Sequence, residues 1–256
     1  MGRAKDIRVK PISAQDANRI IRQLHYSGKV VQNSQLHLGV FLDGKCGGAL
    51  QFGPSLDKRK IIGLVADTKW NEFLELNRLA LADWLPRNSE SRAIAVAMRL
   101  LRRHYPHLKW VVSFADGTQC GDGTIYRAAG FVLTGIRANA TIMELDGEVF
   151  TDIGLRTGTE RRTKARQIVA AKTPDNPNYP RPGGRYWSSY VQEQGIGRVL
   201  PGFQLRYIYF LDPACRAKLT VPELPYSAIE EAGAGMYKGK PRSCASSVVA
   251  AQPTHQ

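Results

Sequence analysis

The stretch from Glu75 to Gly135 constrains the fold of this 256-residue chain most, because apolar runs alternate in it with short polar breaks. Leu74 to Ala82 is mostly apolar and ends in a turn-like Asp-Trp-Leu-Pro run. After it, Asn88 or Ser89 can cap a helix, and apolar side chains recur at helical spacing up to His104. The stretch therefore predicts a strand, a long helix, a strand, a short helix and a strand, in that order.

The second strand of this stretch, Trp110 to Ala115, shows no polar alternation, which is typical of a strand that is buried on both faces. Asp116 ends this strand, and a glycine-rich turn then opens the short helix that carries Tyr126. In open α/β sheets, ligands collect beyond the carboxyl ends of strands and at helix N-termini. Asp116 and the loop at 87–92 before the long helix are therefore the two places where we expect a ligand site.

The flanking segments add further elements of both kinds. Ser13 can cap a helix that runs to Leu24, and Asp43-Gly44 is a strong signal for a hairpin between two strands. Together the elements predict an α/β (α+β) fold with a mixed central sheet flanked by helices. The strands expected outside the central stretch are 7–12, 36–42, 46–52 and 141–145, with 203–210 as one more strand packing on the core.

The composition of the sequence changes near Leu155. Residues 156–172 carry six basic side chains against the single acidic Glu160, and a segment too rich in proline and glycine for regular structure follows at 173–184. We expect a catalytic domain at 1–154, a basic linker rich in proline and glycine at 155–185, an extension packing on the core at 186–238, and a disordered tail at 239–256.

The net charge of +14 favours a polyanionic partner, because neutralising phosphates releases counterions. A basic C-terminal extension is the expected DNA contact, with the candidates Arg161, Arg162, Lys164 and Arg166. A solvated charge run is the alternative for this segment. Scattered cysteines and the lack of a signal-like or membrane-spanning apolar run favour a cytoplasmic protein without a membrane partner.

Four segments carry a resemblance to a known family. They are Leu24-His25-Tyr26-Ser27, Glu75-Leu76-Asn77-Arg78-Leu79, the run from Pro86 to Arg92, and the long run from Ser113 to Phe131. This pattern resembles the Mom family of phage DNA adenine-modification proteins, and the order of elements resembles the GNAT-type N-acetyltransferase fold. The last match is specific because of its length, whereas a lone His-Tyr pair is not.

The resemblance implies an enzyme that converts adenine in DNA to N6-carbamoylmethyladenine and so protects phage DNA from host restriction in the bacterial cytoplasm. It also implies an iron requirement. Carried over by position, the catalytic and metal-binding residues are His25, Tyr26, Asp116 and Tyr126, and the donor-binding residues are Arg78, Asn88, Ser89 and Ser91. Double-stranded DNA with a flipped adenine is the implied partner. The oligomeric state is open, and a dimer is compatible with the sequence.

The residues themselves allow two chemical interpretations. Imidazole, carboxylate and phenolate are donors that suit iron. Without a metal, Asp116 can accept a proton from the adenine amine while Tyr126 donates one to a leaving group. Structural roles are the alternatives: a helix C-terminal cation for His25, core aromatics for Tyr26 and Tyr126, and a turn cap for Asp116.

Alternatives also remain for the identity of the donor substrate and for the activity. The loop Arg87-Asn88-Ser89-Glu90-Ser91-Arg92 lacks the glycines with which many acyl-CoA enzymes bind pyrophosphate, and Glu90 repels phosphate. Acyl-CoA therefore stands beside other activated two-carbon donors, including aminoacyl-tRNA. The alternative functions are an acyl-CoA-dependent N-acyltransferase acting on an amine or protein and a non-catalytic basic DNA-binding protein.

Overall fold

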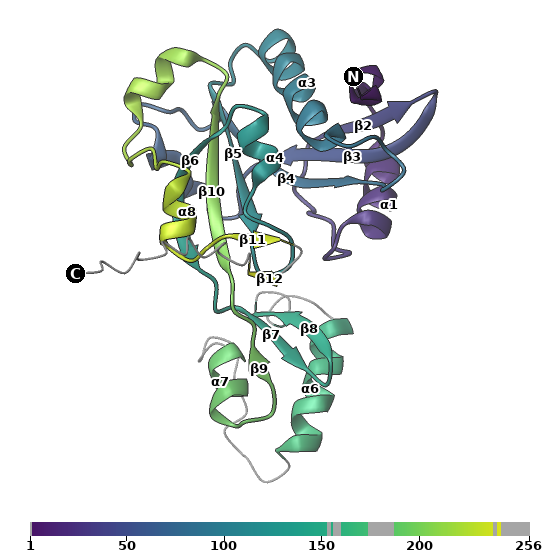
Figure 1. Ribbon diagram of the computed structural model, residues 1–256, viewed down its shortest axis with the longest axis vertical. Coiled ribbons are helices and arrows are strands. Elements are labelled where there is room, and N and C mark those ends of the chain that lie inside the picture. Colours follow the sequence, from purple (N-terminus) through teal and green to yellow (C-terminus); the bar gives the residue numbers. More distant parts are fainter. Residues whose placement is uncertain (1, 153–154, 156–159, 174–186, 238–239, 242–256) are drawn as a thin grey trace, which may run out of the picture.

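The computed structural model describes residues 2–152, 155, 160–173, 187–237 and 240–241. Figure 1 shows a large sheet with its helices and, below it, a smaller unit formed by the chain between β6 and β10. The large sheet has seven strands in the order β1-β2-β3-β4-β5-β10-β6. Their bounds are β1 Arg8–Pro11, β2 Leu36–Leu42, β3 Lys45–Gly53, β4 Phe73–Leu81, β5 Trp110–Asp116, β10 Phe203–Phe210 and β6 Val132–Ala138.

The sheet is mixed, because β4 and β5 are parallel while the other neighbouring strands are antiparallel. The predicted mixed sheet flanked by helices is thus confirmed. Trp110, Val111 and Val112 have no exposed surface, as expected for a strand covered on both faces. Val111 packs into the largest apolar cluster, and its two neighbours pack into a second one, because successive side chains of a strand point to opposite faces.

Helices α1, α3, α4 and α8 lie beside this sheet (Figure 1). The long helix α3 contributes Ile94, Ala97, Met98 and Leu101 to the largest cluster, whereas α1 packs Ala17 and Ile21 against β3 and β4. Their bounds are η1 Arg3–Asp6, α1 Ala14–Leu24, α2 Lys58–Ile61, η2 Ile62–Leu64, α3 Ser89–His104, α4 Thr124–Ala128, η3 Pro213–Lys218 and α8 Ser227–Glu231.

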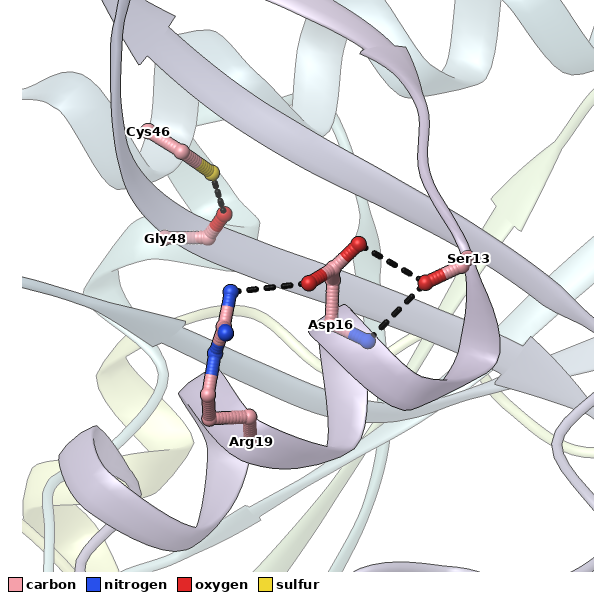
Figure 2. Close-up of polar contacts among 5 residues, drawn as sticks. All are labelled: Ser13, Asp16, Arg19, Cys46 and Gly48. Atoms are coloured by element: carbon pink, nitrogen blue, oxygen red, sulfur yellow. Dashed lines mark hydrogen bonds and ion pairs between the residues drawn. The ribbon is translucent and has the colours of Figure 1, made fainter.

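The predicted start of the first helix is confirmed by its hydrogen bonds (Figure 2). The Ser13 hydroxyl oxygen accepts from the Asp16 backbone N–H at 3.0 Å and donates to the Asp16 carboxylate at 2.8 Å. Arg19 then donates to the other oxygen of that carboxylate at 2.8 Å. The cap satisfies an amide that has no partner inside the helix, and it thereby fixes where α1 begins. His25 follows the last residue of this helix, Leu24.

The smaller unit corrects the expected linker at 155–185. The segment Glu160–Lys172 is the helix α6, and its Ala165 and Val169 are fully buried. They share an apolar cluster with Phe150 and Trp187, so this part of the chain carries a core of its own. The sequence did not reveal this helix, because basic side chains lie between its apolar positions. The other elements of the unit are β7 Ile142–Leu145, β8 Glu148–Thr151, α7 Trp187–Glu193 and β9 Arg198–Val199, and β7 lies between β8 and β9 in a separate sheet.

Two further expectations change with this arrangement. The strand expected at 141–145 belongs to the smaller unit rather than to the main sheet. The strand expected at 203–210 does not merely pack on the core, because β10 lies inside the main sheet between β5 and β6. A local pattern specifies a strand but not its partners, which is why the sequence did not place either one. Most of the tail at 239–256 lies outside the described residues; Lys240–Pro241 forms β12, which pairs with β11, Met236–Tyr237.

Among the described residues, no helix is both long enough and apolar enough to cross a membrane. Three of the four cysteines, Cys46, Cys120 and Cys215, are free thiols, and Cys244 lies outside the described part of the chain.

Candidate active site

The candidate site lies where β4 and β5 stop pairing. The two parallel strands are in register only from Phe73 with Trp110 to Glu75 with Val112. Beyond these residues β4 continues to Leu81 and β5 to Asp116 without pairing to each other in the described chain. Polar and ionisable side chains gather at these carboxyl ends, the position at which open α/β sheets bind ligands.

Asp116 is the last residue of β5, and its carboxylate is held by the loop that follows. One oxygen accepts from the Thr118 backbone N–H at 3.0 Å, and the other accepts from the Gln119 side-chain amide at 3.4 Å. Burial raises the pKa of Asp116, while these hydrogen bonds oppose the rise. The expected turn-capping contact is therefore present, and the carboxyl group is at the same time a stronger base than a solvated aspartate.

His25 ends α1, and Tyr26 follows it with its ring against the imidazole at a centroid distance of 4.2 Å. The Ser27 backbone N–H donates to His25 Nδ1 at 3.2 Å, and the Ser27 hydroxyl lies 2.8 Å from the same atom. Because Nδ1 accepts, the neutral ring carries its proton on Nε2. Burial, and secondly the charge of Arg78, lower the pKa of His25 to about 4. His25 is therefore a neutral hydrogen-bond donor at pH 7, not the helix C-terminal cation.

Tyr26 connects the His-Tyr motif to the end of β5. Burial of its hydroxyl raises the pKa of Tyr26, and the charges of Asp116, Cys120 and Tyr126 raise it further. The residue as a whole is nevertheless 49% exposed. The structure thus brings the sequence-predicted residues His25, Tyr26, Asp116 and Tyr126 into one group, although their catalytic roles stay predictions.

Tyr126 sits on the first turns of α4 and is 8% exposed. Its ring contacts those of Phe131 and Tyr207 at centroid distances of 5.6 and 5.4 Å, so it is also the core aromatic that the sequence allowed. Burial raises the pKa of Tyr126 to about 12, opposed by a hydrogen bond with Ser113. Its hydroxyl is therefore protonated at neutral pH.

Arg78 and Glu75 place two opposite charges beside this group. Arg78 donates to the Lys29 carbonyl at 3.0 Å and to the Asn77 carbonyl at 2.7 Å, which fixes its guanidinium near His25 and Tyr26. Burial raises the pKa of Glu75, and the nearby polar side chains and the charge of Arg78 oppose the rise. Glu75 was missing from the predicted site. Its signal was an ionisable side chain close to Asn77 and Arg78 in a central strand, where a buried charge needs partners.

The predicted donor-binding residues divide between two places. Asn88, Ser89 and Ser91 line a cavity of about 280 Å³ at the N-terminus of α3, whereas Arg78 lies with the catalytic candidates. The Ser89 and Ser91 hydroxyls donate to the carbonyls of Pro86 and Asn88, at 2.6 and 3.2 Å. Asn88 has a left-handed backbone, and its side chain does not cap the helix. Glu90 lines the cavity and its charge reaches Cys120, which connects cavity and site.

The iron site expected from the resemblance stays a prediction. Among the described residues, no three His, Cys, Asp or Glu side chains lie together as a metal-binding group. Nδ1 of His25 and both oxygens of Asp116 already take part in hydrogen bonds, and the cation among these groups is Arg78. We therefore derive no step through iron.

The predicted DNA-binding residues all lie on α6, outside the main sheet. Lys164 forms an ion pair with Glu148, and Lys172 forms one with Asp146, so the β7–β8 hairpin neutralises part of the charge of this helix. Arg166 is partly buried. The side chains of Arg161 and Arg162 lie outside the described residues.

The fold has partial likeness to solved acetyltransferases. A Bacillus subtilis acetyltransferase in complex with CoA is 7% identical, with a TM-score of 0.41 over 80% of this chain and 98% of that one. The Escherichia coli ribosomal-protein-S18-alanine N-acetyltransferase is 10% identical, with a TM-score of 0.38 over 80% of this chain and 94% of that one. These scores carry no inference about the site.

Comparisons of the amino-acid sequence show to which family the chain belongs. The sequence model of the Mom protein family matches residues 6–228, which include every residue of the candidate site. A protein of Escherichia phage Mu, the methylcarbamoylase mom, is 44% identical over 175 residues, 65% of this chain and 72% of the phage Mu protein. The chain belongs to the Mom protein family, as its motifs predicted.

Proposed function

We propose that this protein transfers a carbamoylmethyl group to N6 of adenine in phage DNA and thereby shields that DNA from host restriction enzymes. The observation that carries the proposal is the 44% identity to a methylcarbamoylase of phage Mu. It is supported by the grouping of His25, Tyr26, Asp116 and Tyr126 around the carboxyl end of β5.

The reaction forms a bond between adenine N6 and the methylene carbon of the transferred group. The bond between that carbon and its leaving group breaks, and N6 loses one proton. Asp116 is the proposed acceptor of this proton, since its raised pKa lies closer to the working pH than that of a solvated aspartate. Its hydrogen bonds to Thr118 and Gln119 hold the carboxylate in place.

Hydrogen-bond donors and one cation of the same group stabilise the negative charge that develops on the leaving group. Tyr126 is protonated, with a pKa of about 12, and is the proposed donor to that group. His25 donates through Nε2–H, and Arg78 supplies a fixed positive charge. Hydrogen-bond donors that are held before the reaction begins stabilise developing negative charge at little reorganisation cost.

The cavity at the N-terminus of α3 is the proposed site of the donor. Backbone amides and the helix dipole favour a negatively charged group there. Acyl-CoA is one candidate, and other activated two-carbon donors are equally compatible because Glu90 also lines the cavity. The carbamoylmethyl group is joined through a methylene carbon rather than through a carbonyl, so a simple acyl transfer does not yield it.

Double-stranded DNA is the proposed substrate, with the adenine extruded from the stack because N6 of a paired base is not accessible to the site. Plasmid from cells that express the protein should resist restriction enzymes with adenine in their recognition sequences. It should stay sensitive to enzymes whose sequences contain only G·C pairs. Full sensitivity to every enzyme, from cells with abundant folded protein, would contradict the proposal.

A further inference from the structure

The C-terminal segment of the described chain runs across the loop that follows β5. Leu224 N–H donates to the Leu133 carbonyl at 2.8 Å, and the Tyr226 hydroxyl donates to the Phe131 carbonyl at 2.6 Å. Further along, Asp122 N–H donates to the Met236 carbonyl at 3.3 Å, and Gly121 and Tyr237 form a β-bridge. This segment, 224–237, therefore holds the loop that carries Cys120 and adjoins Asp116.

The two residues of β11 point in opposite directions, as strand neighbours do. Met236 is 2% exposed, and a Cβ on Gly117 would lie 3.0 Å from its side chain, so it packs under the loop. Tyr237 is 62% exposed. The bridge to Gly121 places this exposed tyrosine one residue away from Cys120.

Tyr26 reaches the same loop from the other end of the chain. The charges of Asp116 and Cys120 act on its hydroxyl, and about half of the residue is exposed at 49%. Two large, exposed aromatic side chains, one N-terminal and one C-terminal, thus adjoin the loop at 116–121. Exposed aromatic rings beside a site are suited to stacking on a nucleobase, because every base has a π-face.

We propose that Tyr237 and Tyr26 form an aromatic rim that stacks on the adenine extruded from the duplex and holds it over Asp116. This rests on the proposed function. It assigns substrate binding to Tyr237, a residue outside the span that the family model matches, and explains why β11 is fastened to the site loop.

The aromatic rim is tested by measuring the affinity of the protein for two DNA duplexes in the absence of any carbamoylmethyl donor. One duplex carries an unpaired adenine opposite an abasic site, and the other carries an abasic site in place of that adenine; neighbouring bases are randomised in both. The wild type should prefer the first duplex, and Tyr237→Ala should reduce this preference about 5- to 100-fold, the usual worth of one base–aromatic stack. Tyr237→Phe should keep the preference, since it keeps the ring.

Trp70→Ala is the matched control. Trp70 is 53% exposed and lies before β4, at the opposite end of the parallel strands from Asp116, so its loss should leave the preference unchanged. Retention of the preference by Tyr237→Ala, or no preference in the wild type, would overturn the rim. Adenine modification of plasmid DNA is measured separately. A protein that modifies adenine but does not prefer the duplex with the unpaired adenine would contradict only the aromatic rim. A protein that prefers this duplex but does not modify adenine would contradict only the proposed reaction.

Discussion

Asp116 combines a partly buried carboxylate with a position at the end of a central strand, and its ionisation therefore has a cost for the fold. Because its pKa is raised in the folded state, the folded protein binds this proton more tightly than the unfolded chain does. Stability from this group is fully present below the unfolded pKa of about 4 and is lost as the pH rises through the folded pKa. The carboxylate is thus retained at a cost in stability, as is usual for catalytic groups.

Asp116→Asn should accordingly raise the melting temperature at neutral pH. Asparagine never ionises, and its side-chain oxygen can still accept from the Thr118 N–H. The gain should shrink as the pH falls towards about 4, where the wild-type carboxyl is protonated as well. Thermal unfolding of both proteins across this range measures it. A gain that does not change with pH would contradict a raised pKa.

His25 gives a second prediction for a single residue. With a pKa of about 4, its imidazole should show no titration between about pH 5.5 and 8, and its nitrogen shifts should be those of the Nε2–H tautomer. Because this pKa is lowered, the contribution of His25 to stability should be complete above about 6.5 and should fall as the pH drops towards 4. Nitrogen NMR identifies the tautomer directly. A midpoint of the imidazole titration near 6.5 would show that the ring is solvated.

Tyr126→Phe separates the catalytic role of that residue from the structural one. The ring contacts with Phe131 and Tyr207 remain, so the free energy of unfolding should change by only about 1 kcal/mol for the missing hydrogen bond. Adenine modification should fall about 100-fold or more if the hydroxyl donates to the leaving group. Urea unfolding and nucleoside analysis on the same preparations measure the two effects, and a variant that modifies DNA normally would return Tyr126 to a purely structural role.

At the scale of elements, local signals predicted what is local. The Ser13 cap and the Asp43-Gly44 turn with its two positive φ values are both confirmed. The sequence did not place β10 between β5 and β6, because that pairing joins segments far apart in the chain. For the same reason the convergence of His25 with Asp116 came from the family resemblance, and Glu75 was missed.

The turn before α4 is the element on which the site depends most. Gly123 has φ +83°, and a Cβ there would clash with the Tyr207 ring, whose hydroxyl donates to the Asp122 carbonyl at 2.5 Å. Gly123→Ala should therefore cost both backbone strain and a steric clash, together several kcal/mol of unfolding free energy, roughly 3 or more.

Gly147→Ala isolates the strain from the clash. Gly147 has φ +77° and nothing within 4 Å of a built Cβ, so its substitution should cost only about 1 kcal/mol. Urea denaturation of both variants measures the difference. Equal decreases in stability would mean that Tyr207 does not hold the turn in the described position.

At the scale of the molecule, the chain between β6 and β10 forms a second unit with its own core and a basic helix, α6 (Figure 1). Among the residues expected to bind DNA, Lys164 is paired within the unit and Arg166 is partly buried, so Arg161 and Arg162 are the two to test first. Reversing both arginines to glutamate should weaken DNA binding. It should also flatten the salt dependence of binding, by about one unit of slope for each phosphate that is no longer neutralised.

Charge reversal at Lys5 and Arg8 is the matched control for this experiment. Both side chains are exposed at the start of the chain, and the change in net charge is the same. A salt slope that falls equally in both double variants would indicate a general charge effect, and an unchanged slope in the Arg161 and Arg162 variant would remove α6 from the interface.

The central claim is that Asp116 serves a reaction on adenine in DNA. Nucleoside mass spectrometry of plasmid DNA, from cells expressing either the wild type or Asp116→Ala, tests it most directly. We predict a deoxyadenosine heavier by one carbamoylmethyl group in the wild-type sample and its absence in the variant sample, with both proteins folded. Unmodified deoxyadenosine in both samples, or equal modification in both, would contradict the account.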